Sequence, residues 1–585
     1  MRLRVTKCKN TDIFYVIKTV YVDGKQKTKT VERIGNTNEV KQKSNGEDPY
    51  VWAKKYVAEL NKQEQEGTRK IIIEKSQTKK IEKDKNNSYN CGYLFLEDIY
   101  YDLGLNKICE DISSNYQFKY DLNNILSRLV YGRIIFPSSK LATNELSKKF
   151  IEQPNFDLQH IYRALEILSK EIDNIQSELY KNSLNVVDRN TGILYYDCTN
   201  YFFEIEEESG IRQYGPSKEH RPNPISQMGL FMDGNGIPLA VDINPGNTNE
   251  QITLKPLEEK ILKDFDLSKF IVCTDAGLSS YDNRKFNDKD ERAFITTQSI
   301  KTLKKHIKEW ALSPTGWLLP GDKKEYDISK LEETEESKKA NYNRTFYKKR
   351  WIKENDLEQA LIVTYSLKYK HYQENIRNNQ IERARKALQN KNFKLEKHNQ
   401  NDYKRFITKT AITEDGEIAE KKILTINQEQ ITKEEQYDGF YGVCTNLEDD
   451  VTEIIKVNQR RWEIEESFRI MKSEFKARPV YLSRDDRIQA HFLICFIALL
   501  IHRILEKKLE EKYTAEEIID TLRNMNLYKE GTEGYIPTYT RTNITDEIHK
   551  KYGFRTDYEI TTEKKMKKIL KDIKNKNDTQ NQKHH

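Results

Sequence analysis

The sequence predicts an α/β protein that contains a mixed sheet, an inserted α+β subdomain and a mainly helical N-terminal region. Two apolar runs, GILYYD at 192–197 and FIVCTD at 270–275, have the composition of short buried strands. Between them, residues 229–246 contain two more strand-like runs around an Asp233-Gly234 turn. Because a tight turn joins antiparallel strands, the sheet cannot be entirely parallel and is expected to be mixed.

Length and charge limit the class of protein. A chain of 585 residues is too long for one hydrophobic core, so about three or four domains are expected. Lys and Arg number 99 against 92 Asp and Glu, a net charge of +7. This small excess permits a polyanionic partner but does not require one.

Cellular location is expected to be cytoplasmic. The first 16 residues contain no apolar run long enough for a secretory signal. The longest apolar run, at 492–501, is far shorter than the ~20 residues that cross a bilayer, and it predicts a buried core helix.

The seven cysteines form no Cys-x-x-Cys pair, which argues against a structural zinc site and gives no reason to expect a disulfide framework.

The N-terminal third is predicted as three successive regions. Residues 1–45 form a small β module, because 11–35 alternate apolar and polar residues around Asp23-Gly24. Residues 46–90 hold a helix and a charged linker that is rich in Lys, Glu and Asn. Residues 91–188 are mainly helical, with a cap at Asp121 and a stop at Pro137 for one of the helices.

The sheet region is expected in two parts, 189–299 and 439–530. The separation between them exceeds an ordinary connection, so 300–438 is predicted as an inserted subdomain. It contains long helices rich in Lys and Glu and a hairpin that turns at Asp415-Gly416. Residues 531–585 are expected to form a basic C-terminal tail.

Residues 457–475 are predicted as one helix with an unusual arrangement of charge. Its apolar stripe consists of Ile464, Phe468, Met471 and Phe475. Arg461, Glu465 and Lys472 lie beside that stripe, whereas a solvated helix would distribute its charges over the far side. An ordinary salt-bridged helix is the alternative interpretation.

Three acidic residues have the pattern of a metal site. Asp197 and Asp275 each end an apolar run, so their carboxylates lie close together if the two strands are neighbours, and the helix of Glu465 could add a third. Three carboxylates repel one another unless a cation lies among them. Hard oxygen ligands suit Mg²⁺ or Mn²⁺, which assist phosphoryl transfer, and Arg461 and Lys472 would then face the phosphate. Taken singly, each Asp has the alternative role of a turn residue.

These residues resemble the DDE transposases of bacterial insertion sequences, in the class with a Tyr-x2-Arg-x3-Glu-x6-Lys signature. Arg461, Glu465 and Lys472 match that spacing, while Asn458 stands at the tyrosine position. The two aspartate motifs of the class resemble YYDCTNYFFE and CTDAGLSS. Further similar blocks are SKEHRPNPISQMGL, INPGNTNEQITL, YDGFYGVCTNL, GYLFLEDIYYDLGL and RIIFPSSKLAT.

The resemblance implies an RNase H-like core in which Asp197, Asp275 and Glu465 are catalytic and bind two Mg²⁺ or Mn²⁺ ions. It implies cleavage of double-stranded DNA at transposon ends and attack of the freed 3′-OH on target DNA, by a homodimer in the DNA complex. The N-terminal module and the helical region would bind the terminal inverted repeats. Residues expected to contact DNA are Arg461, Trp462, Lys472, Asn458, His220 and Arg221. Asn458 cannot supply the phenol that relatives use.

Two other functions are left open by the sequence. One is a catalytically silent DNA-binding protein derived from such an enzyme, and the other is a metal-dependent nuclease that cleaves without joining.

Cys198 and Cys273 lie beside the two aspartates, which suggests thiol chemistry. Because cysteine is a common buried residue and no histidine lies nearby in sequence, both are interpreted as packing residues.

Overall fold

The computed structural model describes all residues except 10, 23–24, 67–69, 74, 79, 391–394, 396–401, 413–420 and 581–585. The chain divides into two compact units. The first comprises Met1–Cys91, Met525–Thr542 and Gly553–Asp572, and the second comprises Gly92–Asn524, Asn543–Tyr552 and Ile573–His585. The predicted turns at Asp23-Gly24 and Asp415-Gly416 lie outside the described residues.

The first unit contains two small antiparallel sheets. One has the order β1-β2-β3, and the other has the order β16-β15-β4. The elements are β1 Arg2–Lys7, β2 Asp12–Val22, β3 Lys25–Asn36, α1 Thr37–Lys43, α2 Pro49–Glu66, β4 Ser88–Asn90, β15 Asn526–Glu530 and β16 Gly534–Pro537. Phe14, Val16 and Ile34 pack with Val40 and Val57 of the two helices, which closes one face of the first sheet.

The segment 531–585, expected as a basic tail, contains folded elements. It holds β16, α19 Asn543–Tyr552 and α20 Glu563–Gln580. Five lysines of α20 are exposed, whereas Met566, Ile569 and Ile573 recur at helical spacing and are buried; the exposed lysines are Lys564, Lys565, Lys567, Lys568 and Lys571. These apolar residues explain why the segment folds in spite of its charge.

The second unit begins with a group of helices. They are α3 Tyr93–Asp102, α4 Leu105–Asn115, α5 Leu122–Ile135, α6 Lys140–Leu146, α7 Leu158–Lys170 and α8 Ile172–Ser183. As predicted, Asp121 caps α5: its carboxylate accepts a hydrogen bond from the backbone N–H of Asn124 at 2.8 Å. The helix ends two residues before Pro137, which cannot continue it.

An eight-stranded mixed sheet follows, with the order β10-β11-β14-β9-β8-β5-β6-β7. Its strands are β5 Ile193–Phe202, β6 Ile225–Asp233, β7 Pro238–Pro245, β8 Ile271–Thr274, β9 Ala293–Gln298, β10 Phe346–Glu354, β11 Leu357–Tyr365 and β14 Phe440–Thr445. Only the pairs β5–β8 and β8–β9 are parallel among these strands. The mixed sheet and the antiparallel pair on either side of Asp233-Gly234 are therefore confirmed.

The segment 300–438, predicted as an inserted subdomain, is divided between two places. Its strands β10 and β11 extend the large sheet, whereas β12 Ile407–Ile412 and β13 Lys421–Ile426 form a separate hairpin beside α13 Leu367–Leu388. Other helices of the second unit are α9 Leu254–Asp264, α10 Tyr281–Phe286, α11 Lys305–Leu312, α12 Glu335–Asn341, α14 Gln428–Glu435 and α18 Ala515–Asn524. Short 3₁₀ turns occupy Ser147–Lys149, Glu250–Ile252, Ile300–Thr302, Ile328–Lys330 and Tyr403–Phe406.

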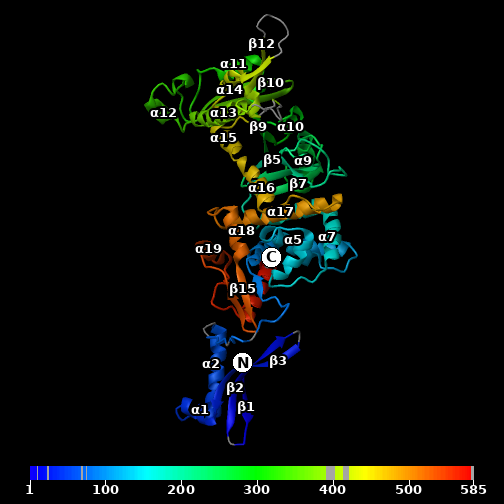
Figure 1. Ribbon diagram of the computed structural model, residues 1–585, viewed down its shortest axis with the longest axis vertical. Coiled ribbons are helices and arrows are strands. Elements are labelled where there is room, and N and C mark those ends of the chain that lie inside the picture. The colour runs from blue at the N-terminus through cyan, green and yellow to red at the C-terminus, as the bar shows by residue number, and fades with distance from the viewer. Residues whose placement is uncertain are drawn as a thin grey trace. The chain divides into compact units, whose positions relative to one another are not determined.

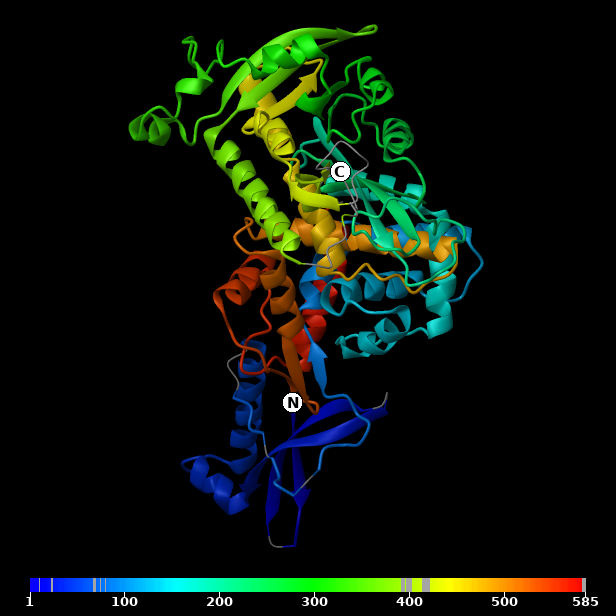
Figure 2. The same ribbon diagram turned by 45° about the horizontal axis from the view of Figure 1, so that its top comes forward.

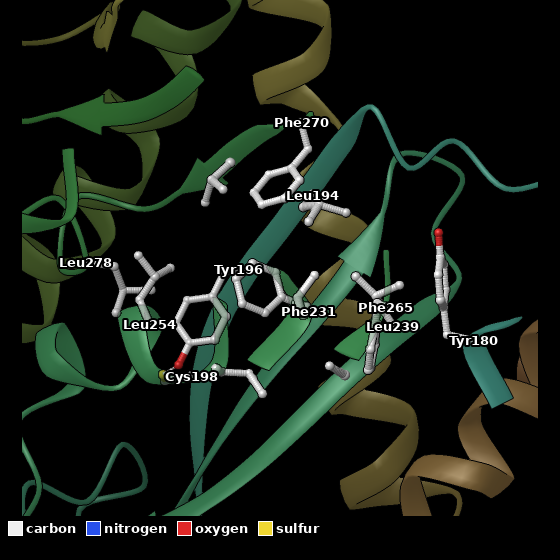
Figure 3. Close-up of a cluster of buried hydrophobic side chains, with 14 residues drawn as sticks. Tyr180, Leu194, Tyr196, Cys198, Phe231, Leu239, Leu254, Phe265, Phe270 and Leu278 are labelled. Carbon is white, nitrogen blue, oxygen red and sulfur yellow. Dashed lines mark hydrogen bonds between the residues drawn. The ribbon is translucent and has the colours of Figure 1, made fainter. Parts of the chain in front are cut away.

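Strand β5 separates two environments because successive side chains point to opposite faces of a sheet. Leu194, Tyr196 and Cys198 join an apolar cluster with Leu254 of α9 and Phe265 (Figure 3). The alternate residues point to the face that carries α15 Val451–Gln459 and α16 Trp462–Ser473. There the Tyr195 phenol donates to the backbone carbonyl of Val457 at 2.8 Å. Asp197 belongs to this second set.

Helix α17, Asp485–Lys508, lies between the sheet and the N-terminal helices of the unit (Figures 1 and 2). It contacts α5 and α7 on one side and β7 on the other. By length and composition it is the one described helix that could cross a membrane, yet 94% of its apolar window is buried inside the protein. The predicted core helix at 492–501 is thus part of a longer buried helix.

Candidate active site

The two aspartates meet across a parallel pair of strands. Strands β5 and β8 are neighbours, which is the condition under which the two carboxylates were expected to lie close together, and Tyr195 lies opposite Cys273. Two residues further along this register, Asp197 and Asp275 occupy matching positions. The prediction that a strand ends at Asp197 is wrong, because β5 continues to Phe202 and pairs there with β6. Strand β8 does stop just before Asp275.

The carboxyl group of Asp197 is buried, and its environment is unusual for an acid. The side chain is 9% exposed and accepts a hydrogen bond from the backbone N–H of Cys198 at 2.7 Å. Burial raises the pKa of Asp197 to about 6, with a further increase from the negative charge of Asp275 and opposing effects from Lys218 and Arg461. A cation bound beside this carboxyl group would favour its charged form. A buried acid with a raised pKa is therefore suited to bind a metal ion.

The segment around Glu465 is two helices, so the prediction of one continuous helix over 457–475 is wrong. Helix α15 ends at Gln459 and α16 begins at Trp462. In a regular helix the carbonyl of Val457 would accept from the N–H of Arg461. Instead the Val457 carbonyl accepts from the Tyr195 phenol at 2.8 Å and from the Arg460 N–H at 3.2 Å, and the Arg461 N–H donates to the carbonyl of Asn458 at 3.3 Å. The predicted apolar stripe is nevertheless buried at all four positions, Ile464, Phe468, Met471 and Phe475.

Glu465 lies on the same face of the sheet as Asp197, and Arg461 interacts with both acids. Its side chain is 58% exposed, and its carboxylate is 3.3 Å from the Arg461 guanidinium. The positive charge of Arg461 in turn lowers the pKa of Asp197. Among the described residues, no three acidic, histidine or cysteine side chains are gathered closely enough to hold a metal ion. The structure thus places the two aspartates close enough for their charges to interact. The ligand set of three acids stays a prediction.

Lys472 faces the site from the last turn of α16. Its ammonium lies 3.5 Å from a carboxylate oxygen of Glu219 and 5.5 Å from the centre of the Tyr201 ring. Burial lowers the pKa of Lys472 to about 8, assisted by the neighbouring charge of Lys218 and opposed by that of Asp197. Lys472 therefore belongs to the same electrostatic environment as Asp197.

Two site residues, Lys218 and Glu219, were not identified from the sequence. The Lys218 ammonium lies 3.1 Å from Glu250 and also bonds the carbonyl of Cys198, next to Asp197. The predicted residues of this loop, His220 and Arg221, are exposed. Both pairs lie in the SKEHRPN motif, so the motif was the correct signal, but only the loop conformation shows which partner each side chain contacts.

The remaining predicted contacts differ in accessibility. Trp462 is 57% exposed at the start of α16. Asn458 is only 6% exposed, and its amide donates to the phenol of Tyr441 at 3.1 Å. Cys198 is buried, and burial raises the pKa of its thiol to about 12; burial also raises the pKa of Cys273. Both thiols stay protonated, in agreement with their interpretation as packing residues.

Comparison with known proteins identifies one domain. Residues 364–501 match the family described as transposase DDE domain, and this range includes Glu465 with its neighbouring cations but neither aspartate. No curated protein matches the chain. The piggyBac transposase synaptic complex with hairpin DNA, solved by cryo-EM, has 9% identity over 83% of this chain and 84% of that chain, with a TM-score of 0.35. That likeness is weak.

Proposed function

Since residues 364–501 carry a transposase DDE domain, we propose that this protein is the DNA transposase of an insertion sequence. It binds the terminal inverted repeats of its element, cleaves the DNA there and joins the freed 3′-OH to target DNA. The observation that carries this proposal is the position of Asp197 on β5 and of Asp275 directly after the neighbouring strand β8, with the Glu465 helix of the matched domain on the same face. The order β7-β6-β5-β8-β9 supports an RNase H-like core.

The acids fit a hard divalent cation. Asp197 and Asp275 supply carboxylate oxygens, the ligands that Mg²⁺ and Mn²⁺ prefer. Glu465 would complete the set if its carboxylate exchanged Arg461 for the metal. Two such ions would stabilise the attacking and leaving oxygens of the phosphoryl transfer. The DDE transposase family supports this cofactor.

The chain's own cations would position the DNA. Arg461 and Lys472 both act on Asp197 electrostatically, so a phosphate that reached them would lie beside the acids. The exposed ring of Trp462 is accessible for stacking on a base. A homodimer would hold two transposon ends together, as cut-and-paste joining requires two ends.

The test is cleavage and joining of a labelled transposon end with Mg²⁺ or Mn²⁺. Glu465→Gln and Asp275→Asn should bind the end as well as the native protein but give neither cleaved nor joined product. Glu453→Gln is the matched control, because Glu453 is an exposed acid on α15 that pairs only with Lys456 among the described residues. A native protein that cleaves without joining is a nuclease, and one that binds without cleaving is a silent DNA-binding protein.

A further inference from the structure

The carboxylate of Glu219 is contacted by cations from three different segments. Lys472 of α16 lies 3.5 Å from Oε1, and the guanidinium of Arg478, which follows that helix, contacts the same oxygen. Arg221, in the same loop as Glu219, has its Nε 3.7 Å from Oε2. One negative charge therefore faces three positive charges.

The three cations share a single acidic partner among the described residues. Within the described part of the chain, Glu219 is the one carboxylate at ion-pair distance from any of them. Burial lowers the pKa of Lys472 and of Arg478, as expected for cations with too few counter-charges. The positive charge of the cluster therefore exceeds the negative charge of Glu219, which favours binding of an anion of higher charge than one carboxylate.

Each of the three cations also contacts an aromatic ring. The guanidinium groups of Arg221 and Arg478 lie 4.0 and 5.7 Å from the centre of the Phe202 ring. The Lys472 ammonium lies 5.5 Å from the Tyr201 ring. Cation–π contacts of this kind orient the cations independently of Glu219, so the cluster would keep its geometry if the carboxylate moved away.

We propose that this cluster is a phosphate-binding site and that Glu219 occupies it until DNA binds. A phosphodiester offers the same kind of oxygen pair to Arg and Lys as a carboxylate does. This inference rests on the proposed function, since that function makes DNA the source of the phosphate. Because Lys472 also acts on Asp197, the bound phosphate lies next to the acids. Glu219 therefore competes with DNA and weakens binding in the resting protein.

The first experiment compares Glu219→Gln with native protein, using a labelled DNA duplex of arbitrary sequence and fluorescence anisotropy over a range of salt concentrations. Glu219→Gln should lower the Kd by about three- to tenfold, because the competing anion is gone. Glu207→Gln is the matched control: Glu207 is an exposed acid in the same loop with the same charge change. Adding Arg478→Gln to Glu219→Gln should abolish the gain and make the slope of log K against log salt shallower by about 0.9.

The second experiment replaces DNA by inorganic phosphate and measures Tm. Phosphate should stabilise Glu219→Gln more than the native protein, and it should lose this effect when Arg478→Gln is added. Stabilisation by phosphate with no duplex binding by any variant would retain the site and refute the proposed function. Duplex affinity of Glu219→Gln equal to that of Glu207→Gln, with no phosphate effect, would overturn the inference. If Glu219→Gln does not fold, an unchanged salt slope in Arg478→Gln alone would also overturn it.

Discussion

Replacing Asp197 by Asn should stabilise the protein at neutral pH. The pKa of this buried carboxyl group is raised to about 6 from the ordinary 3.8, with burial as the largest cause. The native state therefore holds the proton more tightly than the unfolded state does. With respect to this group, stability is greatest below about pH 4 and falls as the pH rises through about 6.

The size of the effect follows from the shift. A difference of about two pKa units corresponds to about 3 kcal/mol at pH 7, where both states are ionised. Asn has the same shape and no charge, but its amide must find new partners at a site where the carboxylate accepts from the Cys198 N–H. Subtracting about 1–2 kcal/mol for that adjustment leaves a net gain of about 1–2 kcal/mol at pH 7.

The assay is urea-induced unfolding followed by circular dichroism at a series of pH values from 4 to 7.5. Asp449→Asn is the control, since Asp449 is an exposed acid in the same unit of the chain. Near pH 4 the advantage of Asp197→Asn should disappear, because the native carboxyl group is then protonated. Millimolar Mg²⁺ should stabilise the native protein and have less effect on Asp197→Asn, because one ligand is gone.

Two results would refute the reasoning. Asp197→Asn could be less stable than native protein at pH 7 with an unaltered pH dependence between 4 and 6, which would mean that the charge of Asp197 carries no cost. Alternatively, Mg²⁺ could stabilise native protein and Asp197→Asn equally, which would place the metal elsewhere.

Three further predictions concern the surroundings of the site. Tyr195→Phe removes the bond to the Val457 carbonyl and should cost about 1 kcal/mol by urea unfolding while also slowing DNA cleavage; unchanged cleavage would mean that this bond is irrelevant to catalysis. Trp462→Ala should leave stability within about 0.5 kcal/mol but weaken duplex binding about tenfold, and equal affinity would exclude stacking. Met566→Ala should cost about 2–5 kcal/mol, whereas the exposed Lys567→Ala should not; equal costs would contradict the burial of α20.

Local patterns in the sequence predicted the elements that depend on local physics. The cap at Asp121, the stop at Pro137 and the buried stripe of α16 were all correct, because each follows from spacing within one segment. The pairing of β5 with β8 was only a condition of the site prediction, and the structure meets that condition.

Contacts between distant segments could not be predicted in this way. At the break between α15 and α16, the Val457 carbonyl bonds the phenol of Tyr195, which is remote in sequence, and the inclusion of β10 and β11 in the large sheet depends on pairing with β14. The contacts of Lys218 with Glu250 and of Glu219 with Lys472 depend on the conformation of one loop. Such tertiary effects override local preference.

The alternation along β5 has a consequence for the gene. Substitutions at Leu194, Tyr196 or Cys198 alter the apolar cluster and leave the opposite face unchanged, so the two faces can evolve separately. Loss or gain of a single codon within 193–202 would exchange the faces, placing a carboxylate in the apolar cluster and aromatic rings beside the acids. In this strand, a reading-frame-preserving deletion of one residue should therefore be tolerated far less often than a substitution.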